Sequence, residues 1–228
     1  MQTSEHSYDV IIAGGGVIGA SLACALADAG LRIGVIDARE PQTDWPAGSV
    51  DQRVFAISCA SQSLFARLGV WDGIRERGVS PYREMQVWDA AGPGRIHFDA
   101  AELGEPLLGH IIEQRVLQAA LLEGQQTRPG LERLCPAVLS DFRVDAAGTV
   151  VRLEDGRELG AALLVGADGA GSRVREQAGI GVQARDYAHT AVVAVVATER
   201  PHAETAWQRF LPAGPLAFLP LRDGRCSI

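Results

Sequence analysis

Three glycines near the start of the chain have the spacing of a loop that holds a dinucleotide. Gly14, Gly16 and Gly19 give the pattern G-x-G-x-x-G directly after the apolar run Val10 to Ala13. The first glycine of this pattern makes a tight turn, the second lets the backbone approach a pyrophosphate, and the third lets a helix pack closely on a strand. The N–H groups of the following helical turn then face the phosphates. The alternative is a glycine-rich turn without a ligand.

Two acidic residues and one arginine complete this candidate nucleotide site. Asp37 follows the run Arg32 to Ile36, where a carboxylate can accept hydrogen bonds from a ribose diol. Asp168 stands between two glycines at the end of another apolar run, Glu158 to Val165. These glycines favour a ligand contact over a bare turn aspartate. Arg53 is a candidate phosphate ligand, and the alternative is a surface arginine.

The elements that must position these residues alternate between strands and helices. The run Val10 to Ala13 predicts a buried strand, and the residues after the glycine loop predict a helix that Gly30 ends. Ser58 is the expected cap of a helix to about Leu68, and Ser172 the expected cap of a short helix. We also expect a helix from Val116 to Leu122 and, as strands, Arg83 to Asp89 in a hairpin with Ile96 to Phe98, Ala137 to Val144, Val150 to Leu153, Glu158 to Val165, Ala191 to Thr198, Trp207 to Leu211 and Leu216 to Leu221.

Composition narrows the kinds of function. The chain has 228 residues and a formal net charge of −7, which argues against a general role in nucleic-acid binding. All 21 basic residues are arginine, so arginine must supply any cationic contact to phosphate. The four cysteines form no C-x-x-C pair and the five histidines are scattered, so we expect a reducing compartment and no metal site. Residues 1–7 lack the basic start of a secretory signal, and we expect an extended or disordered start.

The two glycine motifs together resemble the flavin-dependent aromatic hydroxylases of the para-hydroxybenzoate hydroxylase type. In that family an Asp-Gly motif like the segment Gly166 to Gly169 follows the N-terminal glycine loop and serves both FAD and NAD(P)H. Over Tyr8 to Ile228 the chain is more closely similar to the ubiquinone-biosynthesis hydroxylases, in particular those that act on 2-octaprenylphenol. The stretches that carry this similarity are Arg83 to Trp88, Leu108 to Glu113 and Leu216 to Leu221.

The resemblance implies an FAD-dependent monooxygenase. NAD(P)H would reduce FAD, and an FAD C4a-hydroperoxide would transfer one oxygen atom of O₂ to a polyprenylated phenol ring. By position, Gly14, Gly16 and Gly19 would hold the ADP pyrophosphate and Asp37 the adenosine ribose. The other cofactor-binding residues that it implies are Arg39 near the adenine, Arg53 at a phosphate or the pyridine nucleotide, Gln114 on the flavin side, and Asp168 in the second loop. No residue is assigned as a general acid or base.

The resemblance also implies an architecture. It is an α/β fold, a Rossmann-like FAD-binding domain of the GR2-type flavoproteins with part of a second β-sheet substrate domain. The FAD-binding domain is expected at residues 1–75 and 100–180, and the partial substrate-binding domain at 76–99 and 181–228. The family's third motif, a Gly-Asp-Ala segment at the ribityl side of the flavin, does not occur after Asp168. We therefore expect an N-terminal portion of such an enzyme, with impaired FAD binding and catalysis.

The resemblance also implies expectations about the partners and the cellular location of the protein. Exposed sheet edges would favour association with a second copy or with other ubiquinone-biosynthesis enzymes. A polyprenylated substrate implies work near the inner membrane, but the sequence shows no basic amphipathic helix, so we expect a cytoplasmic protein that is at most peripheral. Two other functions stay open: another FAD oxidoreductase on the same scaffold, and a non-catalytic fragment with a vestigial nucleotide site.

Overall fold

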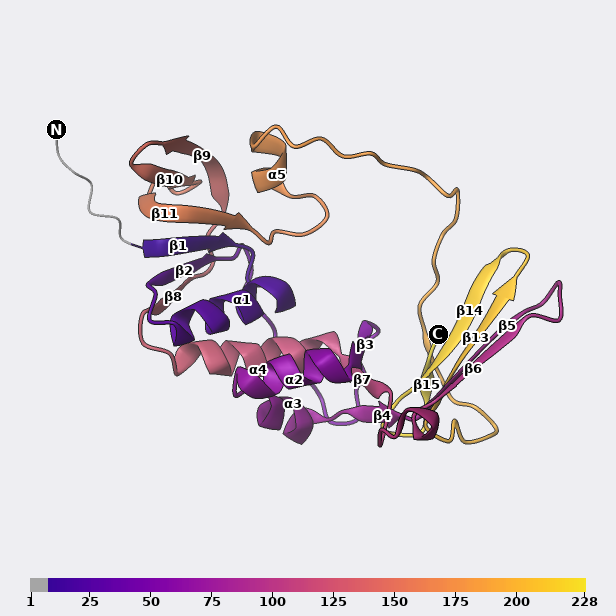
Figure 1. Ribbon diagram of the computed structural model, residues 1–228. Helices are drawn as coiled ribbons and strands as arrows, with labels where there is room; N and C mark the ends of the chain where they lie inside the picture. Colours follow the sequence, from indigo (N-terminus) through magenta and orange to yellow (C-terminus); the bar gives the residue numbers. More distant parts are fainter. Residues whose placement is uncertain (1–7) are drawn as a thin grey trace. The chain divides into compact units, whose positions relative to one another are not determined.

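The computed structural model describes residues 8–228, so the expectation for residues 1–7 lies outside the described residues. The chain divides into two compact units, each made of two segments. The first unit comprises Met1–Thr43 and Gln118–Ala184, and the second comprises Asp44–Leu117 and Arg185–Ile228. Figure 1 traces both units in chain order.

These units have boundaries different from those of the two expected domains. Residues 44–75 and 100–117, which the sequence places with the FAD-binding domain, group with the second unit. The units are defined by contacts within the chain and not by what they bind. The assignment of one domain to FAD and the other to the substrate therefore stays a prediction.

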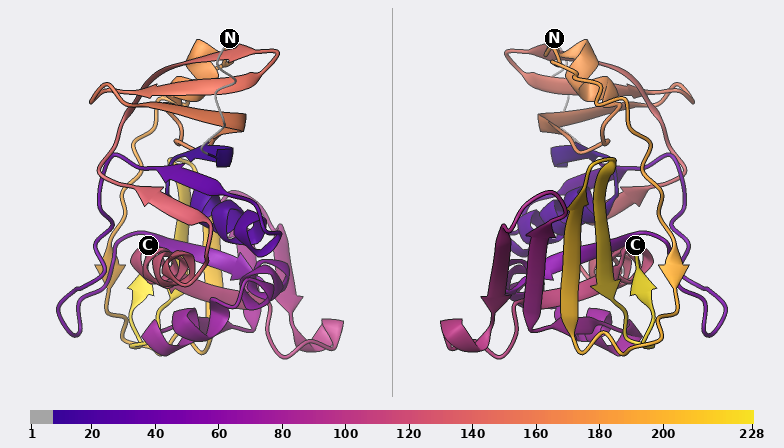
Figure 2. Two further views of the ribbon diagram at one scale, coloured as in Figure 1. Left: turned by 90° about the vertical axis from the view of Figure 1, so that its left-hand side faces the viewer. Right: turned by 90° about the vertical axis from the view of Figure 1, so that its right-hand side faces the viewer.

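The first unit is built on a six-stranded sheet with the strand order β8-β2-β1-β11-β10-β9 (Figures 1 and 2). The strands β8, β2, β1 and β11 run parallel, and β10 and β9 continue the sheet as an antiparallel meander. In chain order its elements are β1 (Tyr8–Ala13), α1 (Val17–Asp28), β2 (Ile33–Ile36), most of α4 (Gln114–Gln126), β8 (Leu131–Leu134), β9 (Leu139–Asp145), β10 (Gly148–Leu153), β11 (Glu158–Gly166) and α5 (Arg173–Gln177).

Strand β1 is buried on both faces, which explains its continuous apolar run. Val10 and Ile12 pack in one core cluster with Ala23 of α1, whereas Ile11 belongs to a second cluster with Val151 of β10. Successive side chains of a strand point to opposite faces, so the part covered on both sides, Val10 to Ala13, has no polar position, whereas Asp9 near the strand's start is partly exposed. The expected strand, glycine loop and helix are confirmed, and the run that precedes Asp37 forms the strand β2.

The second unit holds two sheets. One has six strands in the order β12-β15-β14-β13-β5-β6, and the other has three in the order β3-β7-β4. The expected hairpin of β5 and β6 is confirmed, and β5 also pairs in parallel with β13. In chain order the elements are β3 (Val54–Ser58), α2 (Cys59–Arg67), α3 (Trp71–Arg77), β4 (Ser80–Tyr82), β5 (Glu84–Asp89), β6 (Arg95–Asp99), the 3₁₀ turn η1 (Ala101–Leu103), β7 (Gly109–Glu113), β12 (Val195–Val196), β13 (Thr205–Leu211), β14 (Gly214–Pro220) and β15 (Cys226–Ser227).

Both serine caps are confirmed. The Ser58 hydroxyl accepts a hydrogen bond from the Ser61 N–H at the start of α2, and the Ser172 hydroxyl accepts one from the Arg175 N–H at the start of α5. Such side chains satisfy N–H groups that have no partner within the helix. Gly69 follows α2 with a φ of 67°, a backbone conformation that glycine adopts without strain.

One expected strand is largely wrong. Within Ala191 to Thr198 only Val195–Val196 forms a strand, β12, which pairs with β15. Val192 is 79% exposed and Val193 is 51% exposed, so this apolar run finds no sheet to bury it. Apolar composition alone does not make a strand, because a strand needs a paired neighbour for its backbone groups.

Candidate functional site

The glycine loop joins β1 to α1, and packing explains two of its three glycines. Gly14 has a φ of 105°, and a β-carbon there would come closer than 3.0 Å to the backbone of Ala167. A β-carbon on Gly19 would come closer than 3.0 Å to the carbonyl oxygen of Gly14. These two positions therefore exclude any side chain for reasons internal to the protein. The close packing that the sequence assigned to Gly19 is confirmed.

Gly16 is different, because the space around it is open. It is the N-cap of α1 with φ −64° and ψ 179°, a conformation that other residues adopt easily, and a β-carbon there would meet no heavy atom within 4 Å. No side chain caps α1, and its first turn carries no acidic residue. The free N–H groups of this turn and the bare backbone at Gly16 fit the pyrophosphate of a dinucleotide such as FAD.

Side chains hold the middle of the loop on both sides of Gly15. The Gly15 N–H donates to Oδ2 of Asp37 at 2.8 Å, and the Gly15 carbonyl accepts from Nε2 of Gln118 at 2.5 Å. The other oxygen of Asp37, Oδ1, accepts from the Arg39 N–H at 3.1 Å. Asp37 thus organises the loop, which the sequence analysis did not foresee. A contact of Asp37 with the ribose stays a prediction. A contact of Arg39 with the adenine also stays a prediction, and the Arg39 side chain is exposed.

Asp168 lies at the start of the α5 segment and holds that turn together. Its Oδ1 accepts from the Ser172 hydroxyl at 2.5 Å, and its Oδ2 accepts from the Val174 N–H at 3.2 Å. Partial burial opposes ionisation, but these hydrogen bonds outweigh it and lower the pKa of the Asp168 carboxyl below its ordinary value. The carboxylate therefore carries its charge throughout the physiological range.

Three of the predicted residues converge on one cavity of the first unit. Gly14, Asp37 and Asp168 line a space of about 310 Å³ at the ends of β1, β2 and β11. Ligands of parallel α/β sheets bind at the carboxyl ends of the strands, so this convergence is expected. The cavity also exposes the Arg173 side chain, which the sequence analysis did not single out. Its guanidinium donates to the Leu139 carbonyl at 3.0 Å and to Glu154 at 2.8 Å.

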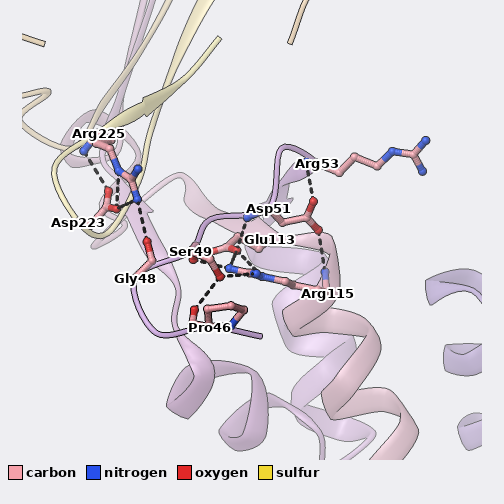
Figure 3. A network of polar contacts seen from close by, with 9 residues as sticks. All are labelled: Pro46, Gly48, Ser49, Asp51, Arg53, Glu113, Arg115, Asp223 and Arg225. Atoms are coloured by element: carbon pink, nitrogen blue, oxygen red, sulfur yellow. Dashed lines mark hydrogen bonds and ion pairs between the residues drawn. The ribbon is translucent and has the colours of Figure 1, made fainter. Parts of the chain in front are cut away.

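Arg53 and Gln114 belong to the second unit, where they line a cavity of about 570 Å³. Phe55 and Leu219 supply apolar parts of its wall. The Gln114 N–H donates to the Arg53 carbonyl at 2.9 Å, so the two residues are neighbours. The Arg53 guanidinium forms no hydrogen bond or ion pair with any described residue, and Figure 3 shows it pointing away from the surrounding polar network.

Gln118 is, with Arg173, a site residue that sequence reasoning missed. It reaches Gly15 across 103 positions of the chain from the middle of α4, and no local pattern marks it. Over residues 8–228 no cluster of three or more histidine, cysteine or acidic side chains is arranged to hold a metal ion. In that same range we find no helix with the length and apolarity needed to span a bilayer.

Comparison with known proteins gives a consistent set of relatives. A family model described as FAD binding domain matches residues 7–224. The chain is 40% identical over 226 residues to the ubiquinone hydroxylase UbiL of Rhodospirillum rubrum, which covers 99% of this chain and 52% of that protein. It is 39% identical over 225 residues to the 3-demethoxyubiquinol 3-hydroxylase of Escherichia coli, with coverages of 99% and 57%.

A solved structure shares the fold. It is PqsL, a probable FAD-dependent monooxygenase from Pseudomonas aeruginosa, with a TM-score of 0.79 at 24% identity over 96% of this chain and 59% of that one. The present chain spans about half the length of the curated relatives it matches.

Proposed function

The chain belongs to the FAD binding domain family, and from this premise we propose that it serves an FAD-dependent monooxygenase that hydroxylates a polyprenylated phenol in ubiquinone biosynthesis. The open backbone at Gly16 is the structural observation that supports FAD binding. The reaction class rests on the two hydroxylases that match nearly the whole chain. Hydroxylation of 2-octaprenylphenol in particular stays a prediction from the sequence.

The residues of the first unit would bind the ADP half of FAD. The backbone at Gly16 and the first turn of α1 would face the pyrophosphate, and Asp37 would accept from the ribose while it holds Gly15. Ionised Asp168 would keep the second loop in place beside the cofactor. These residues would hold FAD, which, once reduced by NAD(P)H, supplies the two electrons that let one oxygen atom of O₂ enter the phenol ring while the other leaves as water.

In the second unit, Arg53 and Gln114 would contact the flavin side of FAD, a phosphate or the pyridine nucleotide. Arg53 offers a free cation for a phosphate or for the pyridine nucleotide NAD(P)H, and Gln114 offers an amide for the flavin side. The apolar wall around them would exclude water and accept an aromatic ring. No side chain of the described residues is assigned a proton-transfer role.

A spectroscopic titration tests the cofactor, and a product analysis tests the reaction. Addition of FAD to the purified chain should quench flavin fluorescence and give a protein-bound flavin spectrum. A chain that takes up no FAD would favour a vestigial site. With FAD bound, oxidation of NADH or NADPH should yield a hydroxylated polyprenyl phenol by mass spectrometry. Oxidation that never couples to such a product would favour another FAD oxidoreductase.

We also propose peripheral contact with the inner membrane, because the proposed substrate carries a polyprenyl tail. Flotation with liposomes tests this, and complete exclusion from the vesicles at low salt would contradict it. Association with a second copy or with other ubiquinone-biosynthesis enzymes is proposed on the exposed sheet edges, and sedimentation analysis of the chain would reveal a stable dimer.

A further inference from the structure

Arg115, at the start of α4, is the centre of the polar network in Figure 3. Its side chain is only 16% exposed, and its partner Glu113 is 15% exposed. The guanidinium donates through Nε to Oε2 of Glu113 at 2.7 Å, and its Nη2 forms an ion pair with the same oxygen at 2.7 Å. A buried charge needs this kind of pairing, and removal of one partner leaves the other uncompensated.

The same guanidinium also holds the segment that precedes β3. It donates through Nη1 to the Ser49 hydroxyl at 2.9 Å and through Nη2 to the Ser49 carbonyl, and it lies over the Trp45 ring at 4.6 Å from the centroid. A planar guanidinium can satisfy a carboxylate, a carbonyl, a hydroxyl and a ring face at once. A lysine at this position would offer one point charge and could not reproduce the set.

Asp51 connects this anchor to Arg53. The Asp51 N–H donates to Oε2 of Glu113 at 2.8 Å, and its Oδ2 accepts from the Arg115 N–H at 3.3 Å. Its Oδ1 accepts from the Arg53 N–H at 3.0 Å, and the Arg53 carbonyl accepts from the Gln114 N–H. The backbone of Arg53 is thus fixed on both sides, while its side chain stays free.

We propose that Arg115 is a positioning residue. Through Glu113 and Asp51 it sets the backbone of Arg53, so that the free guanidinium is presented to an anionic group of the bound cofactor. This deepens the proposed function and rests on it. The alternative is that Arg115 only stabilises the second unit, in which case its loss would not act through Arg53.

Amide hydrogen exchange of the ligand-free chain tests the positioning without any cofactor. Arg115→Lys is expected to speed exchange of the Asp51 and Arg53 amides about ten-fold, because a charge-assisted bond that holds them is weakened. Arg225→Lys is the matched control, since Arg225 also joins an aspartate, Asp223, to the Gly48 carbonyl but forms no hydrogen bond with Asp51, Glu113 or Arg53. Unchanged exchange of the Asp51 and Arg53 amides in Arg115→Lys would overturn the proposal.

A double-mutant cycle in FAD affinity tests the functional consequence. Arg115→Lys is expected to raise the FAD dissociation constant about five-fold in the wild-type background, and to have no further effect when Arg53→Ala is present. Equal effects of Arg115→Lys in both backgrounds would show a merely structural role and overturn the proposal.

Two further results, a variant that does not fold and a wild-type chain that binds no FAD, are distinguished from the results above. If Arg115→Lys does not fold, Asp51→Asn replaces it, since it keeps the size of the side chain and weakens the same link to Arg53; normal exchange of the Arg53 amide in that variant would overturn the proposal. If the wild-type chain binds no FAD, the proposed function fails, and the exchange measurement alone decides whether Arg115 positions Arg53.

Discussion

Replacement of Gly16 by alanine is expected to weaken FAD binding at least ten-fold and leave the chain folded. Gly14, Gly16 and Gly19 differ in the space available for a β-carbon, which the sequence spacing of the three glycines does not reveal. A β-carbon on Gly16 would meet nothing within 4 Å, whereas one on Gly19 would overlap the Gly14 carbonyl. The methyl group of Gly16→Ala would instead occupy the space through which the pyrophosphate reaches the backbone. Gly19→Ala is therefore the matched comparison, in which the protein itself is disturbed.

The surroundings of Gly16 and Gly19 set the expected changes in melting temperature and in the FAD dissociation constant. At an N-cap with the dihedral angles of Gly16, alanine in place of glycine costs up to about 1 kcal/mol, so Gly16→Ala should melt within about 4 °C of wild type. Overlap at Gly19 costs about 1–3 kcal/mol or more and should lower the melting temperature by up to about 12 °C. Loss of one charged hydrogen bond to phosphate costs about 1.5–3 kcal/mol, so Gly16→Ala should raise the FAD dissociation constant at least ten-fold.

The assay combines differential scanning fluorimetry without FAD and a fluorescence titration with FAD. Far-UV circular dichroism of both variants shows whether each is folded before the titration. Gly16→Ala with wild-type FAD affinity would refute the assignment of the open space to the pyrophosphate. A large loss of melting temperature in Gly16→Ala would refute the packing argument instead, because it would mean that the position is not free.

Three further perturbations test other parts of the chain. Gln118→Met removes the amide that donates to Gly15, so FAD affinity should fall several-fold in the fluorescence titration, and an unchanged affinity would mean that the loop needs no such support. Burial lowers the pKa of His110 below its ordinary value of 6.5. Below about pH 6.5 the unfolded chain binds a proton at this histidine more readily than the folded chain does, so the protein loses stability as the pH falls. The free energy of unfolding, measured with urea at pH 7.5 and 5.5, should therefore change less between the two pH values in His110→Phe than in wild type. The pKa of Asp168 is lowered, so its stabilising charge is present above the unfolded value of about 3.9 and is lost as pH falls through the folded value. Asp168→Asn should therefore lower the free energy of unfolding at pH 7 by about 1.5–3 kcal/mol, because the charged acceptor of the Ser172 hydrogen bond is lost, and by less at pH 3. Urea unfolding at the two pH values measures this difference.

Local signals predicted the part of the fold that holds the glycine loop. The apolar run of β1, the helix after the loop and the caps Ser58 and Ser172 each depend on residues that are close in sequence. The parallel pairing of β5 with β13 could not be predicted, because it joins Glu84 to Thr205 and depends on contacts far apart in the chain. The short helix α3 was also missed, since its N-cap residue Val70 makes no side-chain cap bond that a sequence could reveal.

The residues of the candidate site also fall into those that local sequence signals reveal and those that depend on contacts far apart in the chain. Gly14, Asp37 and Asp168 could be brought together from sequence because each follows a strand of one parallel sheet, and the ends of such strands meet at one edge. Gln118 and Arg115 could not, because each acts through a side chain that reaches a distant loop. What a sequence shows is where the backbone turns; which side chains hold that turn depends on tertiary packing.

The bonds on both sides of Gly15 bear on how FAD affinity arises. A loop that becomes ordered only on binding subtracts the free energy of ordering from the affinity. Here Asp37 and Gln118 hold the central peptide groups of the loop by hydrogen bonds within the protein, and the close packing around Gly14 and Gly19 leaves no space for a β-carbon. The contacts at Gly16 can then contribute to FAD affinity with little loss to loop ordering. If FAD binds at Gly16 as proposed, we expect Asp37 and Gln118 to influence FAD affinity as strongly as Gly16 does.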